Sequence, residues 1–321
     1  MPPRRGSPGR TKRALVTLAL IGGLVSTATT RTIGGASATT QRDSAGLLAQ
    51  RGVGGQRGIG GQRGIGGRRG GMRGGARRGG RGPNETSSRI EVRSYQFEPT
   101  GEDIEYAIFV STKVDPKKKS PLLIGLHGLG TPPAVWLSRI TDAAQDAGYI
   151  VAAPMGYNAQ GWYGANGSGR GAVPNLGELS ERDVLDVLDL MRREFNVDDR
   201  RIYLAGHSMG GAGALFLGIK HKHIWAAVGA SAPAVRTQFH GPHDLEQARE
   251  MPMILIQGDD DRAVPVEQTR PWAEKMKALG MTYVYREIRG GTHASTLDDG
   301  ARDMFRFFDK HVRPDRSSPG R

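Results

Sequence analysis

The residues Ile202-Tyr203-Leu204-Ala205-Gly206-His207-Ser208-Met209-Gly210 decide the fold of this chain. The apolar run Ile202–Ala205 predicts a buried strand, and the sequence from Met209 to Lys220 predicts a helix directly after the turn. Gly206 and Gly210 permit a very tight turn, because a Cβ at either position would collide across it. Such a turn strains the backbone of Ser208 by about 1–3 kcal/mol and lifts its hydroxyl clear of the sheet. The stretch therefore predicts a strand–turn–helix unit that presents a serine nucleophile.

On both sides of this unit, short apolar strands alternate with helices. Residues 89–97 and 105–111 alternate in polarity and predict an antiparallel edge pair. Further strands are predicted at 122–126, 149–153, 202–205, 225–230, 253–256 and 283–288, and helices at 133–147, 181–195, 209–220, 266–279 and 299–311. The alternation predicts one α/β domain, a doubly wound and mostly parallel sheet with helices on both faces. Only about 20 residues separate Ala230 from Met253, so no large cap domain is expected.

In such a sheet, chemistry is expected beyond the carboxyl ends of the strands. Three aspartates, Asp259 to Asp261, follow the strand at 253–256, and Gly290-Gly291-Thr292-His293 follows the last strand. A serine hydroxyl is a weak nucleophile that needs a base, and the base needs a carboxylate to orient it. The order serine, acid, histidine is the one that a strand–turn–helix serine motif predicts. We expect a triad of Ser208, His293 and one of the aspartates.

Two backbone amides are expected to bind the oxyanion that forms during acyl transfer. One is the amide of Met209, at the start of the helix after Ser208. The other is the amide of Leu129, because the strand at 122–126 runs into His127-Gly128-Leu129-Gly130. Each such donor stabilises the transition state by roughly 3–4 kcal/mol. His127 is expected to support this loop, and His207 is expected to pack away from the hydroxyl of Ser208.

The sequence from Asn196 to Gly211 resembles that of the α/β-hydrolase superfamily, and the resemblance extends over about residues 90–312. It is similar to the prolyl-oligopeptidase-like, dienelactone-hydrolase-like and secreted esterase branches (polyhydroxybutyrate depolymerase, feruloyl esterase). In those families the acid lies in the pattern G-x-x-D-x-x-V-P. Here the pattern falls on Gly258, Asp261, Val264 and Pro265, so the resemblance implies Asp261 as the acid. It also implies His293 as the base, and an enzyme without metal or organic cofactor.

The expected substrate is a carboxylic ester, either a small molecule or an ester linked to a polymer. The alternative is a peptide bond, cleaved by the same residues in the manner of an S9-like, prolyl-oligopeptidase-type peptidase. Because no large cap is expected between Ala230 and Met253, an open cleft is expected. The sequence departs from true prolyl oligopeptidases in that no β-propeller, which gates substrate size in them, precedes the domain. Tyr157, Trp162 and Tyr163 follow the strand at 149–153 and could line the mouth of the pocket. A loop whose aromatic rings pack on the body of the protein is the alternative for the same residues.

The first 38 residues predict a signal peptide. Five basic residues precede an apolar run of twelve residues from Ala14 to Val25, and Ala36-Ser37-Ala38 is a candidate cleavage site. A run of twelve residues is too short for a transmembrane helix, which needs about 20. We therefore expect export to the periplasm or beyond, without a transmembrane span after cleavage. A basic N-terminus that is never exported is the alternative.

Residues 39–88 predict a linker rich in glycine and arginine, followed by a catalytic domain at 89–313 and a disordered tail at 314–321. Residues 1–89 hold 17 of the 45 Lys and Arg residues but two of the 32 acids, so the remaining 232 residues have a net charge of −2. Sixteen of residues 51–82 are glycine and nine are arginine, with no aromatic residue, which predicts disorder. We expect a cationic tether to anionic envelope surfaces rather than a nucleic-acid-binding segment, because no ring is present to stack on bases.

Overall fold

The structure is a computed structural model that describes residues 87–166 and 173–314. The predicted signal peptide lies outside these residues. So do all but the last two residues of the predicted linker and all but the first residue of the predicted tail. No helix in the described part of the chain has the length and apolar character needed to cross a membrane.

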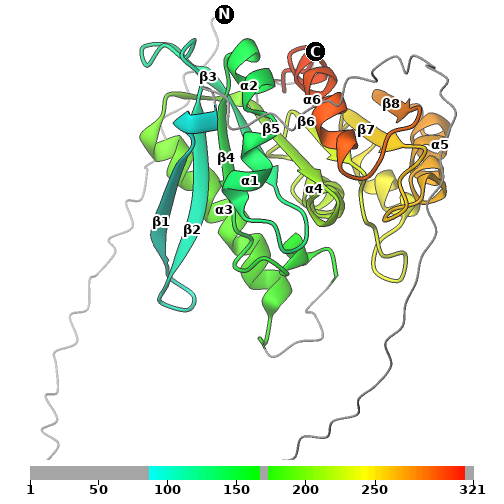
Figure 1. Ribbon diagram of the computed structural model, residues 1–321, viewed down its shortest axis with the longest axis horizontal. Coiled ribbons are helices and arrows are strands. Elements are labelled where there is room, and N and C mark those ends of the chain that lie inside the picture. The colour runs from blue at the N-terminus through cyan, green and yellow to red at the C-terminus, as the bar shows by residue number, and fades with distance from the viewer. Residues whose placement is uncertain (1–86, 167–172, 315–321) are drawn as a thin grey trace, which may run out of the picture. The chain divides into compact units, whose positions relative to one another are not determined.

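Eight strands form one sheet in the order β1-β2-β4-β3-β5-β6-β7-β8 (Figure 1). The strands β1 and β2 are antiparallel to each other, β2 is antiparallel to β4, and all the other pairs are parallel. The predicted edge pair and the mostly parallel sheet are therefore confirmed. The strands are β1 Glu91–Phe97, β2 Glu102–Val110, β3 Ser120–Leu126, β4 Ile150–Pro154, β5 Val197–His207, β6 Ala227–Ser231, β7 Met253–Gly258 and β8 Tyr283–Ile288.

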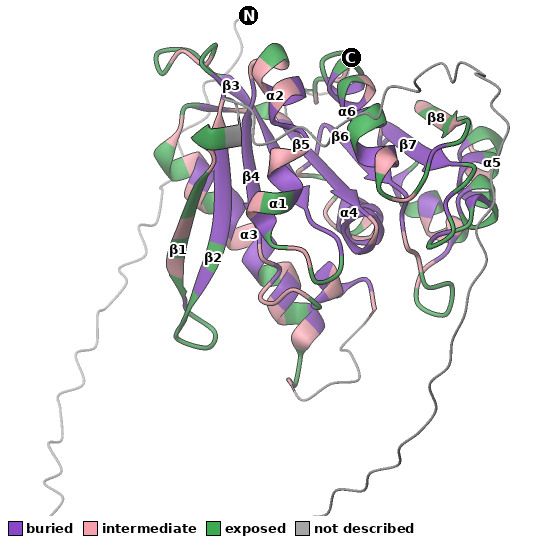
Figure 2. Cartoon of the chain, in the orientation of Figure 1, coloured by how far each residue is buried: buried purple, intermediate pink, exposed green. Residues whose placement is uncertain are grey.

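Helices cover both faces of this sheet, and each face has its own apolar core. One core packs α3, α4 and α5 against the strands through residues such as Leu188, Leu215 and Trp272. The other packs α1, α2 and α6 through residues such as Trp136, Ala144 and Phe308. Figure 2 shows the central strands as buried along most of their length. The helices are α1 Pro133–Ser138, α2 Thr141–Ala147, α3 Leu176–Glu194, α4 Met209–Lys220, α5 Arg270–Ala278 and α6 Ser295–Phe308, with 3₁₀ turns η1 Ser87–Arg89, η2 Trp162–Gly164, η3 Pro242–Ala248 and η4 Val266–Gln268.

The boundaries of several elements differ from the prediction. The helix expected at 133–147 is two helices, because Arg139 and Ile140 donate to carbonyls three residues back and tighten the chain into a turn. The helix α3 begins five residues before the predicted start, and β5 also begins five residues early. The helix α6 begins and ends earlier than the predicted 299–311. Its earlier start still leaves His293 in the loop after β8, where the sequence placed it.

Candidate active site

Ser208 occupies the turn between β5 and α4, in a strained backbone conformation. Its φ and ψ are 58° and −118°, in a region that residues with a side chain rarely adopt. A Cβ on Gly206 would lie 2.1 Å from the carbonyl oxygen of Gly210, and a Cβ on Gly210 would lie 2.0 Å from that of Leu126. Only glycine fits at either position, so the predicted reason for the motif holds in atomic detail.

Hydrogen bonds from three segments hold the backbone of Ser208 in this conformation. Its amide donates to the carbonyl of Ser231, at the end of β6, over 2.9 Å. Its own carbonyl accepts from the amides of Ala212 and Ala234, each over 3.0 Å. The strain is thus offset by the surrounding structure, which is the condition for a strained residue to persist.

Asp261 and His293 come together from the loops after β7 and β8. The Nδ1 atom of His293 lies 2.8 Å from Oδ2 of Asp261, whose side chain is fully buried. The same carboxylate accepts from the amides of Ala263 and Val264, over 2.9 and 2.8 Å, and from Nε2 of Gln257 over 3.1 Å. These donors fix the carboxylate, which in turn orients Nδ1–H of the imidazole toward itself and leaves Nε2 as the basic nitrogen.

The two neighbouring aspartates have other environments. Asp259 accepts from the amide of Gly290, which joins the loop after β7 to the loop after β8. Asp260 is exposed and lies near Arg262. Of the three candidates, Asp261 is therefore the one in contact with His293.

His207 links the serine turn to His293. Its ring packs against the ring of His293 with centroids 4.7 Å apart, and its Nε2 lies 2.9 Å from the carbonyl oxygen of His293. Burial, together with the nearby His293, lowers the pKa of His207 to about 4, so the ring is neutral and donates Nε2–H to that carbonyl. The sequence predicted a packed side chain here but gave no sign of its partner. Since His207 directly precedes Ser208, this contact places His293 beside the turn.

The loop after β3 lies next to Ser208. A Cβ built on Gly128 would be 3.6 Å from Cβ of Ser208. Leu129, whose backbone amide is the predicted donor, is 54% exposed. Met209 is the first residue of α4, where an amide has no acceptor within the helix. Both amides predicted to bind an oxyanion therefore belong to segments beside the serine.

The buried His127 and Tyr163 hold the loop after β3 in place through hydrogen bonds. The ring nitrogens of His127 lie 2.8 Å from the carbonyls of Gly128 and Met155, and burial lowers its pKa. The amide of His127 donates to the hydroxyl of Tyr163 over 3.0 Å. His127 therefore supports the loop after β3, as predicted, by joining it to the segment that follows β4.

The prediction that Tyr163 lines the mouth of a pocket is wrong. Its side chain is completely buried, because it packs against Gly213 of α4 and bonds to His127. Tyr157 is half-buried, with its hydroxyl 2.8 Å from Glu102 and its ring against Phe97. Trp162 is half-buried beneath the guanidinium of Arg236, 4.6 Å from its ring centre. The role predicted for Tyr157 and Trp162 stays a prediction.

Asp183 is a buried carboxyl that the sequence did not single out. It accepts from the hydroxyl of Tyr95 over 2.6 Å and from the amides of Gly156 and Tyr157 over 2.6 and 3.1 Å. Burial raises its pKa to about 6. The loop that it holds continues to Ala159, whose carbonyl accepts from the amide of Gly130 over 2.9 Å. The sequence does contain one sign that Asp183 is buried: this acid lies on the same face of the helix as the apolar Val184, Val187 and Met191.

The described residues contain no group of three or more His, Asp and Glu side chains that could hold a metal ion. The whole sequence lacks cysteine, so thiolate ligands are also absent.

Known proteins resemble the chain in sequence and in fold. The profile of the serine aminopeptidase family S33 matches residues 117–248, which include Ser208 but end before Asp261 and His293. A bifunctional acetylxylan esterase/xylanase of Neocallimastix patriciarum is 27% identical over 180 residues, which are 55% of this chain and 24% of that protein. Acyl-protein thioesterase 1 of Emericella nidulans is 30% identical over 222 residues, covering 61% of this chain and 92% of that protein.

A solved structure extends this comparison to the fold. An S-formylglutathione hydrolase from Agrobacterium tumefaciens superposes with a TM-score of 0.58 at 17% identity, over 70% of this chain and 95% of that one. The chain belongs to the α/β-hydrolase superfamily, among its serine hydrolases. It spans about a quarter of the length of the bifunctional relative and nearly all of the thioesterase.

Proposed function

We propose that the chain is an exported serine esterase that cleaves carboxylic esters through an acyl-enzyme intermediate. The observation that carries this proposal is the contact between Asp261 and His293, 2.8 Å long, beside the strained turn that presents Ser208. A strained serine and an imidazole oriented by a buried carboxylate are the parts that acyl transfer needs.

The reaction runs in two halves. Nε2 of His293 takes the proton of the Ser208 hydroxyl while Oγ attacks the ester carbonyl, and Asp261 stabilises the imidazolium. The amides of Met209 and Leu129 hold the oxyanion of the tetrahedral intermediate. The C–O bond of the ester then breaks, and His293 returns the proton to the leaving alcohol. In the second half, water gives a proton to His293 and attacks the acyl-enzyme. The bond between the acyl carbon and Oγ then breaks, and His293 returns the proton to Oγ, which releases the acid and regenerates the Ser208 hydroxyl.

The names of the relatives support an ester-type substrate. One relative is named an acetylxylan esterase and another a thioesterase, and both bonds join an acyl group to a good leaving group. An alcohol or a thiol leaves more readily than an amine, so the proposed machinery suffices for them. Both small esters and esters linked to a polymer remain within the proposal.

The second candidate is peptide hydrolysis. The match of residues 117–248 to the S33 aminopeptidase profile favours it, as does the resemblance to S9-like peptidases. Rates on short acyl esters and on peptide amides, measured side by side, separate the two. Hydrolysis of amides at rates comparable to those of esters would favour the peptidase.

The test of the nucleophile is Ser208→Ala. Because Oγ is the attacking atom, the variant should lose turnover of p-nitrophenyl acetate and labelling by a fluorophosphonate, while circular dichroism remains unchanged. Retention of either activity would refute the role of Ser208. Ser94→Ala is a matched control, because Ser94 is an exposed residue of the edge strand β1, and three strands separate β1 from β5, which ends at the Ser208 turn.

Export and the tether form a separate part of the proposal. A signal peptide at 1–38 predicts that mass spectrometry of the exported protein finds a cleaved N-terminus. Deletion of residues 39–88 should leave catalysis intact and remove salt-sensitive adsorption to anionic vesicles or polymers. An uncleaved N-terminus combined with RNA binding would favour the RNA-binding alternative.

A further inference from the structure

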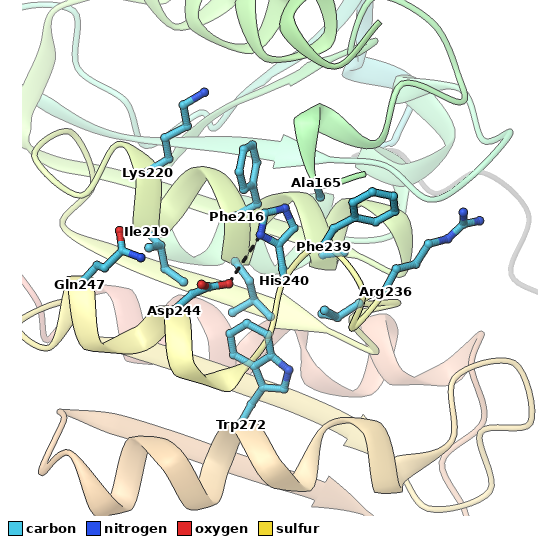
Figure 3. Close-up of a pocket in the computed structure, with 13 residues that line it drawn as sticks. Ala165, Phe216, Ile219, Lys220, Arg236, Phe239, His240, Asp244, Gln247 and Trp272 are labelled. Atoms are coloured by element: carbon cyan, nitrogen blue, oxygen red, sulfur yellow. Dashed lines mark ion pairs between the residues drawn. The ribbon is translucent and has the colours of Figure 1, made fainter. Parts of the chain in front are cut away.

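A cavity of about 270 Å³ lies along α4, the helix that begins directly after Ser208 (Figure 3). Its walls come from α4, from the segment that includes Val235 and Phe239, from η3 and from α5. The apolar wall is formed by Ala212, Phe216, Ile219, Val235, Phe239 and Trp272. Most residues of α4 are apolar and buried, but Phe216 and Ile219 are only half-buried. The face of the helix that carries these two side chains is therefore incompletely covered.

The ionisable groups around the cavity already have partners within the protein. Lys220 pairs with Glu181 over 2.6 Å, and Arg236 stacks on Trp162. Figure 3 shows the charged ends of Lys220 and Arg236 directed away from the cavity. These two cations therefore need no anionic ligand.

The polar pair inside the cavity is also engaged. Asp244 accepts from the amide of Gly241 over 3.0 Å and lies 3.5 Å from Nδ1 of His240. The ring of His240 packs against that of Phe216, with centroids 4.5 Å apart. Burial lowers the pKa of His240, which keeps the ring neutral near pH 7. The surface left for a ligand is mostly apolar, and the acid that lines it, Asp244, is held by the amide of Gly241 and lies beside His240.

One end of the cavity lies close to the backbone of Ser208. The carbonyl of Ser208 accepts from the amides of Ala212 and Ala234, and Ala212 and Val235 line the cavity. The other end is at Ile219 and Lys220, about 12 Å farther along α4 at 1.5 Å per residue. The cavity therefore extends away from the site in one direction.

We propose that this cavity binds the distal part of an uncharged, apolar acyl group of medium length, an inference that rests on the proposed esterase function. Ala212 is about 6 Å along α4 from Ser208, and an extended chain advances about 1.2 Å per bond. Acyl groups of up to about four carbons end before the cavity, whereas an octanoyl group enters it. The volume is below the roughly 300 Å³ typical of sites for whole drug-sized ligands, so it suits one part of a substrate.

Rates on p-nitrophenyl acetate and octanoate test this proposal. Burial of each methylene favours binding roughly fourfold, so the full-length protein should show a higher kcat/KM for octanoate than for acetate. Ile219→Trp fills the far end of the cavity and should lower the ratio of octanoate to acetate at least tenfold. Phe239→Ala removes part of the wall from a side chain that is already 45% exposed, so folding is not at risk, and it should lower the ratio severalfold.

The matched control is Val92→Trp. Val92 is exposed on β1, the edge strand of the sheet, and lies outside the cavity, so this variant should leave the ratio of octanoate to acetate unchanged. A ratio within twofold of the wild-type value in both cavity variants would overturn the acyl site while the esterase proposal stands. Wild-type turnover of both esters without preference for octanoate would also overturn it. Absence of turnover of either ester by the wild type would instead refute the esterase function itself.

Discussion

At the scale of single residues, the choice of acid among three consecutive aspartates depends on where their carboxylates point. Asp261 points inward, where two backbone amides, Gln257 and His293 meet it, whereas Asp260 points to solvent. A local sequence of three equal residues does not contain this difference. The difference comes from the spacing between Asp261 and the following Val264 and Pro265, because the turn between them directs the amides of Ala263 and Val264 toward the carboxylate of Asp261.

Asp261→Asn should lower kcat by about 10³–10⁴-fold with a small change in KM. The amide presents an N–H group to Nδ1 of His293, which favours the tautomer with a protonated Nε2 and removes the base. The measurement is steady-state hydrolysis of p-nitrophenyl acetate. Asp260→Asn is the matched control and should retain activity within twofold. Equal losses in both variants would contradict the assignment.

His207→Ala should lower kcat about tenfold while KM stays within twofold, because the loop that carries His293 loses a hydrogen bond and a packed ring. His207 acts through His293, so it is a positioning residue. His207→Gln keeps an N–H donor at a similar reach and should recover part of the loss. Equal kcat values for the Ala and Gln variants would show that the hydrogen bond to the carbonyl of His293 has no role.

At the scale of elements, α3 supports the loop after β3 although the helix lies outside the candidate active site. Asp183 binds the amides of Gly156 and Tyr157, and that loop in turn binds Gly130 through Ala159. One buried carboxyl thus connects a helix on one face of the sheet to the segment that contains Leu129.

Asp183→Ala should lower the free energy of unfolding by at least about 2 kcal/mol, since it leaves one buried and two part-buried donors without an acceptor, at about 1–3 kcal/mol for each buried group. It should also lower kcat, because the loop beside Ser208 is released. Chemical denaturation and ester hydrolysis measure the two effects. Asp186→Ala on the same helix is the control, since Asp186 pairs with the exposed Arg182. Stability equal to that of the control would contradict the proposed brace.

The elements themselves were predictable because apolar periodicity reports burial within a strand or helix. The strand–turn–helix unit was the clearest case, and α4 has the predicted bounds. Tyr163 was placed wrongly because its burial depends on Gly213, which is 50 positions away and offers space for a ring. The role of Asp183 and the partner of His207 were not predicted for the same reason, since the contacts of both side chains come from other elements and no local pattern encodes them.

At the scale of the whole molecule, two buried groups give stability opposite dependences on pH. The pKa of His207 is lowered from 6.5 to about 4, so the unfolded chain binds this proton more tightly and stability is lost as pH falls from 6.5 to 4. The pKa of Asp183 is raised from 3.8 to about 6, so the folded chain binds the proton more tightly and stability is lost as pH rises from 3.8 to 6. At 1.36 kcal/mol per pKa unit, each effect is about 3 kcal/mol.

Because the two windows overlap, the contributions nearly cancel between pH 4 and 6.5, and single variants should separate them. In His207→Gln the free energy of unfolding should fall by about 3 kcal/mol relative to wild type as pH rises from 4 to 6.5. In Asp183→Asn it should rise by a similar amount over the same range. Urea denaturation at half-unit steps of pH measures both differences. Parallel pH profiles for the two variants would show that these groups do not titrate as their burial requires, because only opposite shifts produce opposite slopes.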